Sequence, residues 1–344
     1  MIKLGKIVGK PKELKKINKT LILNSIKKRR SATKTEIVLD TGISNTTVRT
    51  LLLKLLEENE IISVGLDESS GGRRAERYSL NISKKYILSM IVEEKKIIYN
   101  IVNIIGEVVE ENIIKIESIY DDNIIDTILE DLLSQYGNIK AIGISVPGIV
   151  NKEGYLSGKD IKEWKQVEVN KYIEEKYKIP VILENDLNTL ALGYAMEYKK
   201  NFQKDLNLAY VHFTTLGAGA GLVINGNLVK GKNNFAGEIG IMPIEDSYLN
   251  EVLSRNLSDD EYSRIITNVM TIINCMVSPD MIIVGGNNFK HNLIDNIKKT
   301  YSEKNKIFSE VIVVKDSTKV GLRGITKIAL DLINDDIKII SNGG

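Results

Sequence analysis

Residues 214–226 read TTLGAGAGLVING, a glycine-rich turn placed between two apolar runs. The backbone N–H groups of such a turn can surround phosphate oxygens, because glycine leaves the main chain open to close approach. The same glycines also serve tight turns and close backbone packing without any ligand. The turn therefore leaves two interpretations open, half of an ATP site or a packing device, and the rest of the chain must separate them.

On both sides of this turn, apolar strands alternate with amphipathic helices along residues 81–335. This alternation predicts the α/β class. Two successive sets of strands predict two lobes with a cleft, and ligands of open α/β sheets bind at the carboxyl ends of the strands. The predicted strands are 86–92, 96–104, 107–116, the start of 139–150 before its Pro-Gly loop, 179–186, 206–214, 218–226, 226–231, 281–286 and 310–316. The main predicted helices are 122–137, 259–277 and 319–334.

A chain of 344 residues is long enough for several cores. Residues 1–80 are predicted to form a DNA-binding domain. Residues 81–186 form the first lobe together with a C-terminal helix at about 319–335, and residues 187–318 form the second lobe with the dimerisation surface.

The composition is that of a cytoplasmic globular protein. No apolar run approaches the length of a membrane span, and the N-terminus has no signal-peptide pattern. The single cysteine, Cys275, excludes an internal disulfide and a multi-cysteine metal site. It lies in a helical apolar pattern and is expected in the core. Two histidines, His212 and His291, are too few for a histidine-rich metal site.

The charge is divided unevenly along the chain. Residues 1–80 carry seventeen Lys and Arg against nine Asp and Glu, a net charge of +8, and the remainder carries −6. A basic head on an acidic body is typical of a nucleic-acid-binding module joined to another domain. A solvated lysine-rich segment would give the same charge. The predicted secondary structure of residues 1–80 is therefore needed to distinguish it from a nucleic-acid-binding module.

The head shows the pattern of a winged helix-turn-helix. An apolar helical face runs from Glu13 to about Lys28, and a short helix follows, with Gly42 available to end it. Ser44 then caps a third helix, and two strands around residues 66–72 predict a wing. The alternative is a helical bundle with a hairpin and no ligand.

In a helix-turn-helix the first turns of the second helix contact base edges, and a wing reaches phosphate or the minor groove. The expected partner is double-stranded operator DNA. The residues predicted to contact it are Ser44, Asn45, Thr46, Thr47, Arg49 and Thr50 on the helix, and Arg73 and Arg74 near the wing tip.

Several motifs together resemble the ROK family, which includes bacterial sugar kinases and sugar-responsive repressors. The resemblance implies a two-lobed actin/hexokinase-like (ribonuclease H-like) body, and the head resembles the winged helix of the repressor branch, including its hinge to the body. A homodimer or homotetramer follows from the same resemblance. The motifs are GISVPGIV (143–150), IPVILENDLNTLALGYA (179–195), the stretch from TTLG to GEIG (214–240), MIIVGG (281–286) and the hinge GGRRAERYSLN (71–81).

The resemblance implies a sugar site made of polar side chains that bind hydroxyl groups. Asn185 and Asp186 match the family's sugar-binding pair, and this Asp is the catalytic base in the kinases. Glu238 matches a second sugar-binding carboxylate, and Asp160 aligns loosely with a further contact. Capping of the helix that follows is the alternative role for Asn185 and Asp186.

The ATP half of the site departs from the kinase pattern. Ile91 stands where kinases have an Asp that holds the metal, and Glu93 replaces a glycine beside the triphosphate. An apolar residue cannot hold Mg²⁺, and a carboxylate repels phosphate. Thr215, Gly217 and Gly219 are therefore interpreted as a vestigial phosphate loop.

The zinc module of the family is expected to be absent. Ile241 replaces the usual zinc-binding His, and no cysteine follows it in the segment where the family has several. No metal or cofactor is therefore expected. The loss leaves open whether Glu245, Asp246 or Glu251 takes over a sugar contact.

The sequence therefore predicts a sugar-responsive transcriptional regulator, most simply a repressor of genes for carbohydrate utilisation such as xylose metabolism, and it does not name the sugar that acts as effector. It is not expected to be an enzyme. Two alternatives stay open: an active sugar kinase, and a constitutive DNA-binding protein that has lost effector binding.

Overall fold

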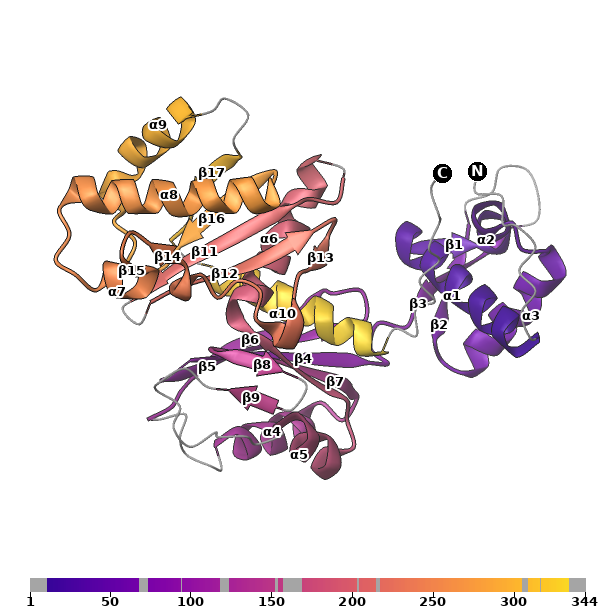
Figure 1. The fold of residues 1–344 in the computed structure, drawn as a ribbon. Coiled ribbons are helices and arrows are strands. Elements are labelled where there is room, and N and C mark those ends of the chain that lie inside the picture. The colour runs from indigo at the N-terminus through magenta and orange to yellow at the C-terminus, as the bar shows by residue number, and fades with distance from the viewer. Residues whose placement is uncertain are drawn as a thin grey trace. The chain divides into compact units, whose positions relative to one another are not determined.

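The computed structural model describes residues 11–67, 74–93, 95–117, 124–151, 154–156, 169–202, 204–214, 217–304, 309–315 and 317–333. The chain forms two compact units. The first runs to Tyr86 and includes the turn Asn103–Glu107, and the second comprises Ile87–Val102 and Val108–Leu332. Figure 1 shows the elements of each unit.

The first unit, called the head below, has the element order predicted for a winged helix-turn-helix. Its helices pack around an apolar core that includes Ile22, Ile37 and Leu55. Gly42, with φ of 68°, ends the second helix in the left-handed region that favours glycine. The elements are α1 (Pro11–Arg29), β1 (Ser31–Thr33), α2 (Lys34–Thr41), α3 (Asn45–Glu57), β2 (Ile61–Leu66) and β3 (Glu76–Leu80), and the strands form an antiparallel sheet in the order β1-β3-β2.

The turn Asn103–Glu107 joins two strands of the second unit but packs with the head. Ile104 and Ile105 contact the apolar core of the head. Lys27 Nζ donates to the carbonyl oxygen of Ile104 at 3.3 Å. The chain therefore contributes to the head from two separate stretches.

The second unit, called the body below, is built on two five-stranded sheets, which confirms the two-lobed α/β prediction (Figure 1). The first sheet has the order β10-β7-β4-β5-β6 and the second the order β13-β12-β11-β16-β17. The strands of the first are β4 (Tyr86–Glu93), β5 (Lys96–Asn103), β6 (Val108–Lys115), β7 (Ile139–Val146) and β10 (Val181–Asn185); those of the second are β11 (Leu208–Thr214), β12 (Gly217–Ile224), β13 (Asn227–Leu228), β16 (Met281–Gly285) and β17 (Glu310–Val313).

Parallel pairing places the ends of particular strands at the same edge. β7 and β10 run parallel, with Val146 opposite Asn185, so the loop after β7 meets the end of β10. β11 runs parallel to β16 and antiparallel to β12. The smaller strands are β8 (Ile149–Asn151), β9 (Gly154–Leu156), β14 (Pro243–Ile244) and β15 (Ser247–Tyr248).

Helices α6 and α10 pack closely in the body. A Cβ built on Gly324 of α10 would lie 1.9 Å from the carbonyl oxygen of Thr189 in α6, so only glycine permits this approach. Thr326 of α10 also donates to Ser89 Oγ of β4 at 2.8 Å. The body helices are α4 (Ile124–Gln135), α5 (Val169–Tyr177), α6 (Asp186–Phe202), α7 (Leu249–Leu253), α8 (Asp259–Val277), α9 (Ile294–Lys304) and α10 (Thr318–Ile333).

One core prediction was wrong. Cys275 is exposed on α8, next to Met276, whose side chain is 78% exposed. The helix buries Ile273 and Asn274 instead, so the last turn presents Cys275 on its outer side. Among the described helices, none is long and apolar enough to cross a bilayer.

Candidate functional site

The first turns of α3 present polar side chains on the face opposite the core. Ser44 caps the helix by accepting the N–H of Thr47 at 3.3 Å, as predicted. Thr47 itself is half-buried, and its hydroxyl contacts Ser44 Oγ at 2.8 Å. Thr50 Oγ1 donates to the carbonyl of Thr46 at 3.0 Å. The side chains exposed on this face are Asn45, Thr46, Arg49 and Thr50.

Only part of the predicted wing tip lies in the described residues. Arg74 is exposed just before β3, while Arg73 lies outside the described residues. The backbone of the wing is closed by an N–H of Asp67 that donates to Ala75 O at 2.7 Å.

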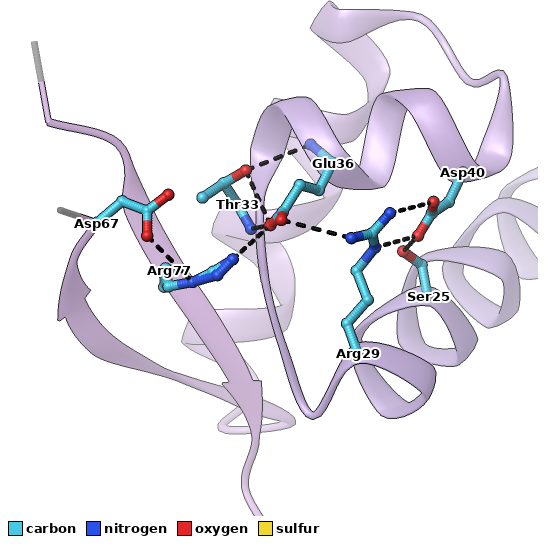
Figure 2. A network of polar contacts seen from close by, with 7 residues as sticks. All are labelled: Ser25, Arg29, Thr33, Glu36, Asp40, Asp67 and Arg77. Carbon is cyan, nitrogen blue, oxygen red and sulfur yellow. Dashed lines mark hydrogen bonds and ion pairs between the residues drawn. The ribbon is translucent and has the colours of Figure 1, made fainter. Parts of the chain in front are cut away.

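A network of ion pairs joins α1, α2 and β3 (Figure 2). Arg29 forms a bidentate pair with Asp40, with Nε–Oδ2 and Nη2–Oδ1 distances of 2.7 and 2.8 Å. Ser25 Oγ donates to the same carboxylate at 2.8 Å. These bonds, first from Arg29 and then from Ser25, lower the pKa of Asp40 to about 2.

Glu36 is the centre of this network. Its Oε2 accepts the N–H of Thr33 at 2.7 Å and completes a capping box at the start of α2. The same oxygen lies 2.7 Å from Nη2 of Arg77 in β3, and Oε1 lies 3.4 Å from Nη1 of Arg29. The bond from Thr33, followed by that from Arg77, holds the pKa of Glu36 below its ordinary value.

In the body, the predicted sugar pair lies at the end of β10 and the start of α6. Asn185 Oδ1 accepts the N–H groups of Leu187 and Asn188 at 2.9 and 3.1 Å, and its Nδ2 donates to Gly148 O at 2.8 Å. Asp186 Oδ1 also accepts the N–H of Leu187, at 2.9 Å. The capping role considered from the sequence is therefore present, and it uses most of the hydrogen-bonding capacity of Asn185.

Asp186 keeps some exposed surface but sits in a desolvated environment. Desolvation, followed by the negative charges of Glu238 and Glu93, raises its pKa to about 7. Desolvation also raises the pKa of Glu238, which lies between Gly237 and a short helical turn at Ile239–Ile241. The charge effects place Glu238 and Glu93 in the electrostatic surroundings of Asp186. Asp160, the looser prediction, lies outside the described residues.

A buried carboxylate that sequence reasoning missed supports this site. Glu184 is 1% exposed, and its Oε1 accepts the N–H of Asn185 at 3.0 Å and Nδ2 of Asn188 at 2.9 Å. Its Oε2 accepts no hydrogen bond of good geometry. The same oxygen forms an ion pair with Lys230, with an Nζ–Oε2 distance of 2.5 Å. The signal in the sequence was an acidic residue inside an apolar strand, directly before Asn185.

The loop that carries Glu238 is attached at two further places. Asn234 Nδ2 donates to the carbonyl of Val150. Gly237 O accepts the N–H of Ala220 at 2.8 Å. With the Lys230–Glu184 pair, these contacts join the Glu238 loop to both sheets of the body.

The predicted phosphate loop is filled by a side chain. Asn250 Oδ1 accepts the N–H of Ala218 at 2.7 Å. A Cβ on Gly217, whose φ is 145°, would lie 2.4 Å from Asn250 Nδ2, and a Cβ on Gly219 would lie 2.6 Å from Leu187. Thr215 lies outside the described residues. Gly217 and Gly219 therefore allow close packing against Asn250 and Leu187, and the N–H of Ala218 is bonded to Asn250.

The three positions that depart from the kinase and zinc patterns lie among the described residues. Ile91 is buried in a cluster with Ile98 and Leu322, and Glu93 pairs with Lys96 at 3.1 Å. Ile241 is 54% exposed. Within the part of the chain that the structure describes, no group of three or more His, Cys, Asp or Glu side chains could hold a metal ion.

Comparison with known proteins agrees with this architecture. A model described as ROK family matches residues 94–252. The chain carries a ROK family domain. It is 31% identical over 241 residues to the xylose repressor of Bacillus subtilis (strain 168), an alignment that covers 67% of this chain and 62% of that repressor.

Solved structures have a similar fold. One of them is similar over almost the whole chain, and another over about three quarters of it. A ROK family transcriptional regulator, a homolog of the E. coli MLC protein, has a TM-score of 0.64 at 18% identity and covers 92% of this chain and 97% of its own. A putative N-acetylmannosamine kinase from Listeria monocytogenes has a TM-score of 0.60 at 20% identity and covers 72% of this chain and all of its own. The chain thus has the ROK/hexokinase-like fold, which regulators and kinases share.

Proposed function

We propose that this ROK protein is a sugar-responsive transcriptional regulator, most simply a repressor of carbohydrate-utilisation genes. One observation carries the proposal: a basic head with an exposed polar face on α3 is joined to a body that has Asn185, Asp186 and Glu238 but a buried Ile91 at the kinase metal position. The similarity to a xylose repressor supports xylose or a related sugar as effector. The proposed partners are operator DNA and a second copy of the chain, in the cytoplasm.

The regulator is further proposed to work without a nucleotide or zinc. Asn250 occupies the phosphate loop, and Ile241 has no metal-binding atom. An apolar side chain at position 91 cannot bind Mg²⁺. These residues support a body that binds sugar and does not phosphorylate it.

The test is a pull-down of fragmented source DNA at fixed, moderate salt, followed by sequencing, with and without each candidate sugar. Salt must be fixed because phosphate contacts dominate non-specific binding. Enrichment of a few palindromic sites, reduced by one sugar, supports the proposal. Uniform recovery of all fragments, or recovery of none, contradicts DNA-reading function.

A kinase remains the second candidate because Asp186, with a pKa of about 7, suits a general base near neutral pH. ATP-dependent phosphorylation of a hexose that disappears in Asp186→Asn would favour it. A constitutive DNA-binding protein is the third. A sugar-induced rise in melting temperature that is absent in Asp186→Ala and Glu238→Ala would exclude that candidate.

A further inference from the structure

Arg77 is a basic residue of the wing, yet its guanidinium is directed to acids of its own chain (Figure 2). Nη2 lies 2.7 Å from Glu36 Oε2, and Nε lies 3.6 Å from Asp67 Oδ1. The side chain is only 24% exposed. Its charge is therefore balanced within the head, in contrast to the exposed Arg49 and Arg74.

The partner Glu36 connects three elements through one carboxylate. It belongs to α2 and closes the capping box with Thr33. It also accepts hydrogen bonds from Arg29 of α1 and from Arg77 of β3. Because β1 pairs with β3 at Thr33 and Arg77, the cap of α2 and the wing strand are neighbours in the sheet. A shared carboxylate at this point fixes the wing strand against α2.

We propose that Glu36, Arg77 and Asp67 form a clamp that sets the position of the wing relative to the helix-turn-helix, and that Arg77 is a positioning residue and not a phosphate contact. This inference rests on the proposed DNA-binding function. The wing and α3 must reach the same duplex at once, so the register between them decides how well both fit. Arg77 and Glu36 are partly buried but still lie at the surface, where ion pairs contribute little to stability, so the clamp acts mainly on geometry.

The matched variants are Glu36→Gln and Arg77→Gln. Glutamine can replace glutamate in a capping box, so Glu36→Gln keeps the start of α2 while removing the charge. Arg74→Gln, at the wing tip, is the control for a true phosphate contact. The probes are a duplex selected by the protein from a random library and a random-sequence duplex of equal length, titrated over a range of salt concentrations.

Both clamp variants should bind the selected duplex about ten-fold more weakly, the effect of about 1.4 kcal/mol. They should bind the random duplex almost unchanged and keep the wild-type slope of log K against log salt. Arg74→Gln should reduce that slope by about 0.9, because one phosphate contact is lost. The double clamp variant should be no weaker than either single variant.

A reduced slope in Arg77→Gln, together with wild-type binding by Glu36→Gln, would overturn the clamp and make Arg77 a phosphate contact. A wild type that binds both duplexes equally would instead refute the proposed function. The clamp is then judged without DNA, from amide hydrogen exchange of Asp67, whose N–H is bonded to Ala75 O. Faster exchange in both variants supports the clamp, and unchanged exchange contradicts it.

Discussion

At the scale of single residues, the chemistry of the body centres on Asp186, whose carboxyl stays protonated up to about neutral pH. Its folded pKa of about 7 lies above the ordinary 3.8. The unfolded chain therefore loses this proton near pH 4 while the folded chain still holds it. From this group, the free energy of unfolding falls as pH rises from about 4 to about 7.

Asp186→Asn should remove this pH dependence, because an amide resembles the protonated acid in shape and does not ionise. The variant should melt near the wild-type temperature at pH 4–5. At pH 8 it should melt higher by at least about 2–4 °C, the shift that 1 kcal/mol gives in a domain of 150–250 residues. Thermal melts at both pH values measure this, and a difference that does not change with pH would contradict the prediction.

Ser44 provides a second test at this scale. Its hydroxyl caps α3 through the N–H of Thr47. Ser44→Ala should destabilise the head by about 1 kcal/mol, whereas Ser44→Thr keeps the cap and should stay near wild type. Denaturant unfolding followed through a probe in the head measures both, and equal loss in the two variants would show that the cap is not the cause.

At the scale of elements, the Lys230–Glu184 pair ties the Glu238 loop to the junction of β10 and α6. Glu184 is 1% exposed, whereas the Lys230 side chain is 41% exposed. Removing Lys230 leaves the buried carboxylate without its cation, at a cost below the roughly 3–5 kcal/mol of a fully buried pair. Lys230→Met should therefore lower the melting temperature of the body.

The double variant Glu184→Gln with Lys230→Met leaves no buried charge and should recover most of that stability. Calorimetric sugar titration of the double variant should still show weaker binding, because the loop has lost its tie. Equal melting temperatures for the single and double variants would show that the buried charge is not responsible.

The same elements show how far sequence reasoning reaches. Strand β4 and helix α8 were predicted to within about a residue, because apolar spacing marks the core-facing side of an element and shows where the pattern stops. Ser44 as a cap was also predicted correctly. Cys275 was wrongly placed in the core, because apolar helical spacing does not show which side of the last turn of a helix is covered by other elements.

The tertiary ties could not be predicted. Lys230 lies 46 positions from Glu184, and Arg77 lies 41 positions from Glu36. A lone charged residue carries no sign of its partner, and only the folded sheet brings such pairs together. Asn250 in the phosphate loop escaped prediction for the same reason.

At the scale of the whole molecule, the proposed regulation requires the sugar site and the DNA-binding face to influence one another. An effector that shifts affinity by 1–3 kcal/mol changes operator binding about 5- to 150-fold. By linkage, operator DNA must weaken sugar binding by the same factor.

Saturating operator should raise the dissociation constant of the sugar by some factor. We expect saturating sugar to raise the dissociation constant of the operator by the same factor. Two calorimetric titrations, with and without the operator duplex, give the first factor, and two operator titrations give the second. Random-sequence DNA at the same salt is the control. If the two factors differ, a further equilibrium, such as a change in oligomeric state, accompanies the binding of one of the ligands.

The turn Asn103–Glu107 bears on how such a protein evolves. Because Ile104 and Ile105 pack against the head's apolar core, the head is not encoded by one uninterrupted stretch of the gene. A crossover near codon 80 would transfer the helices and the wing but leave their last apolar neighbours behind. Recombinant chimaeras that exchange heads between regulators should therefore work best when the donor's turn is grafted as well, so this protein is less modular than a linear domain map implies.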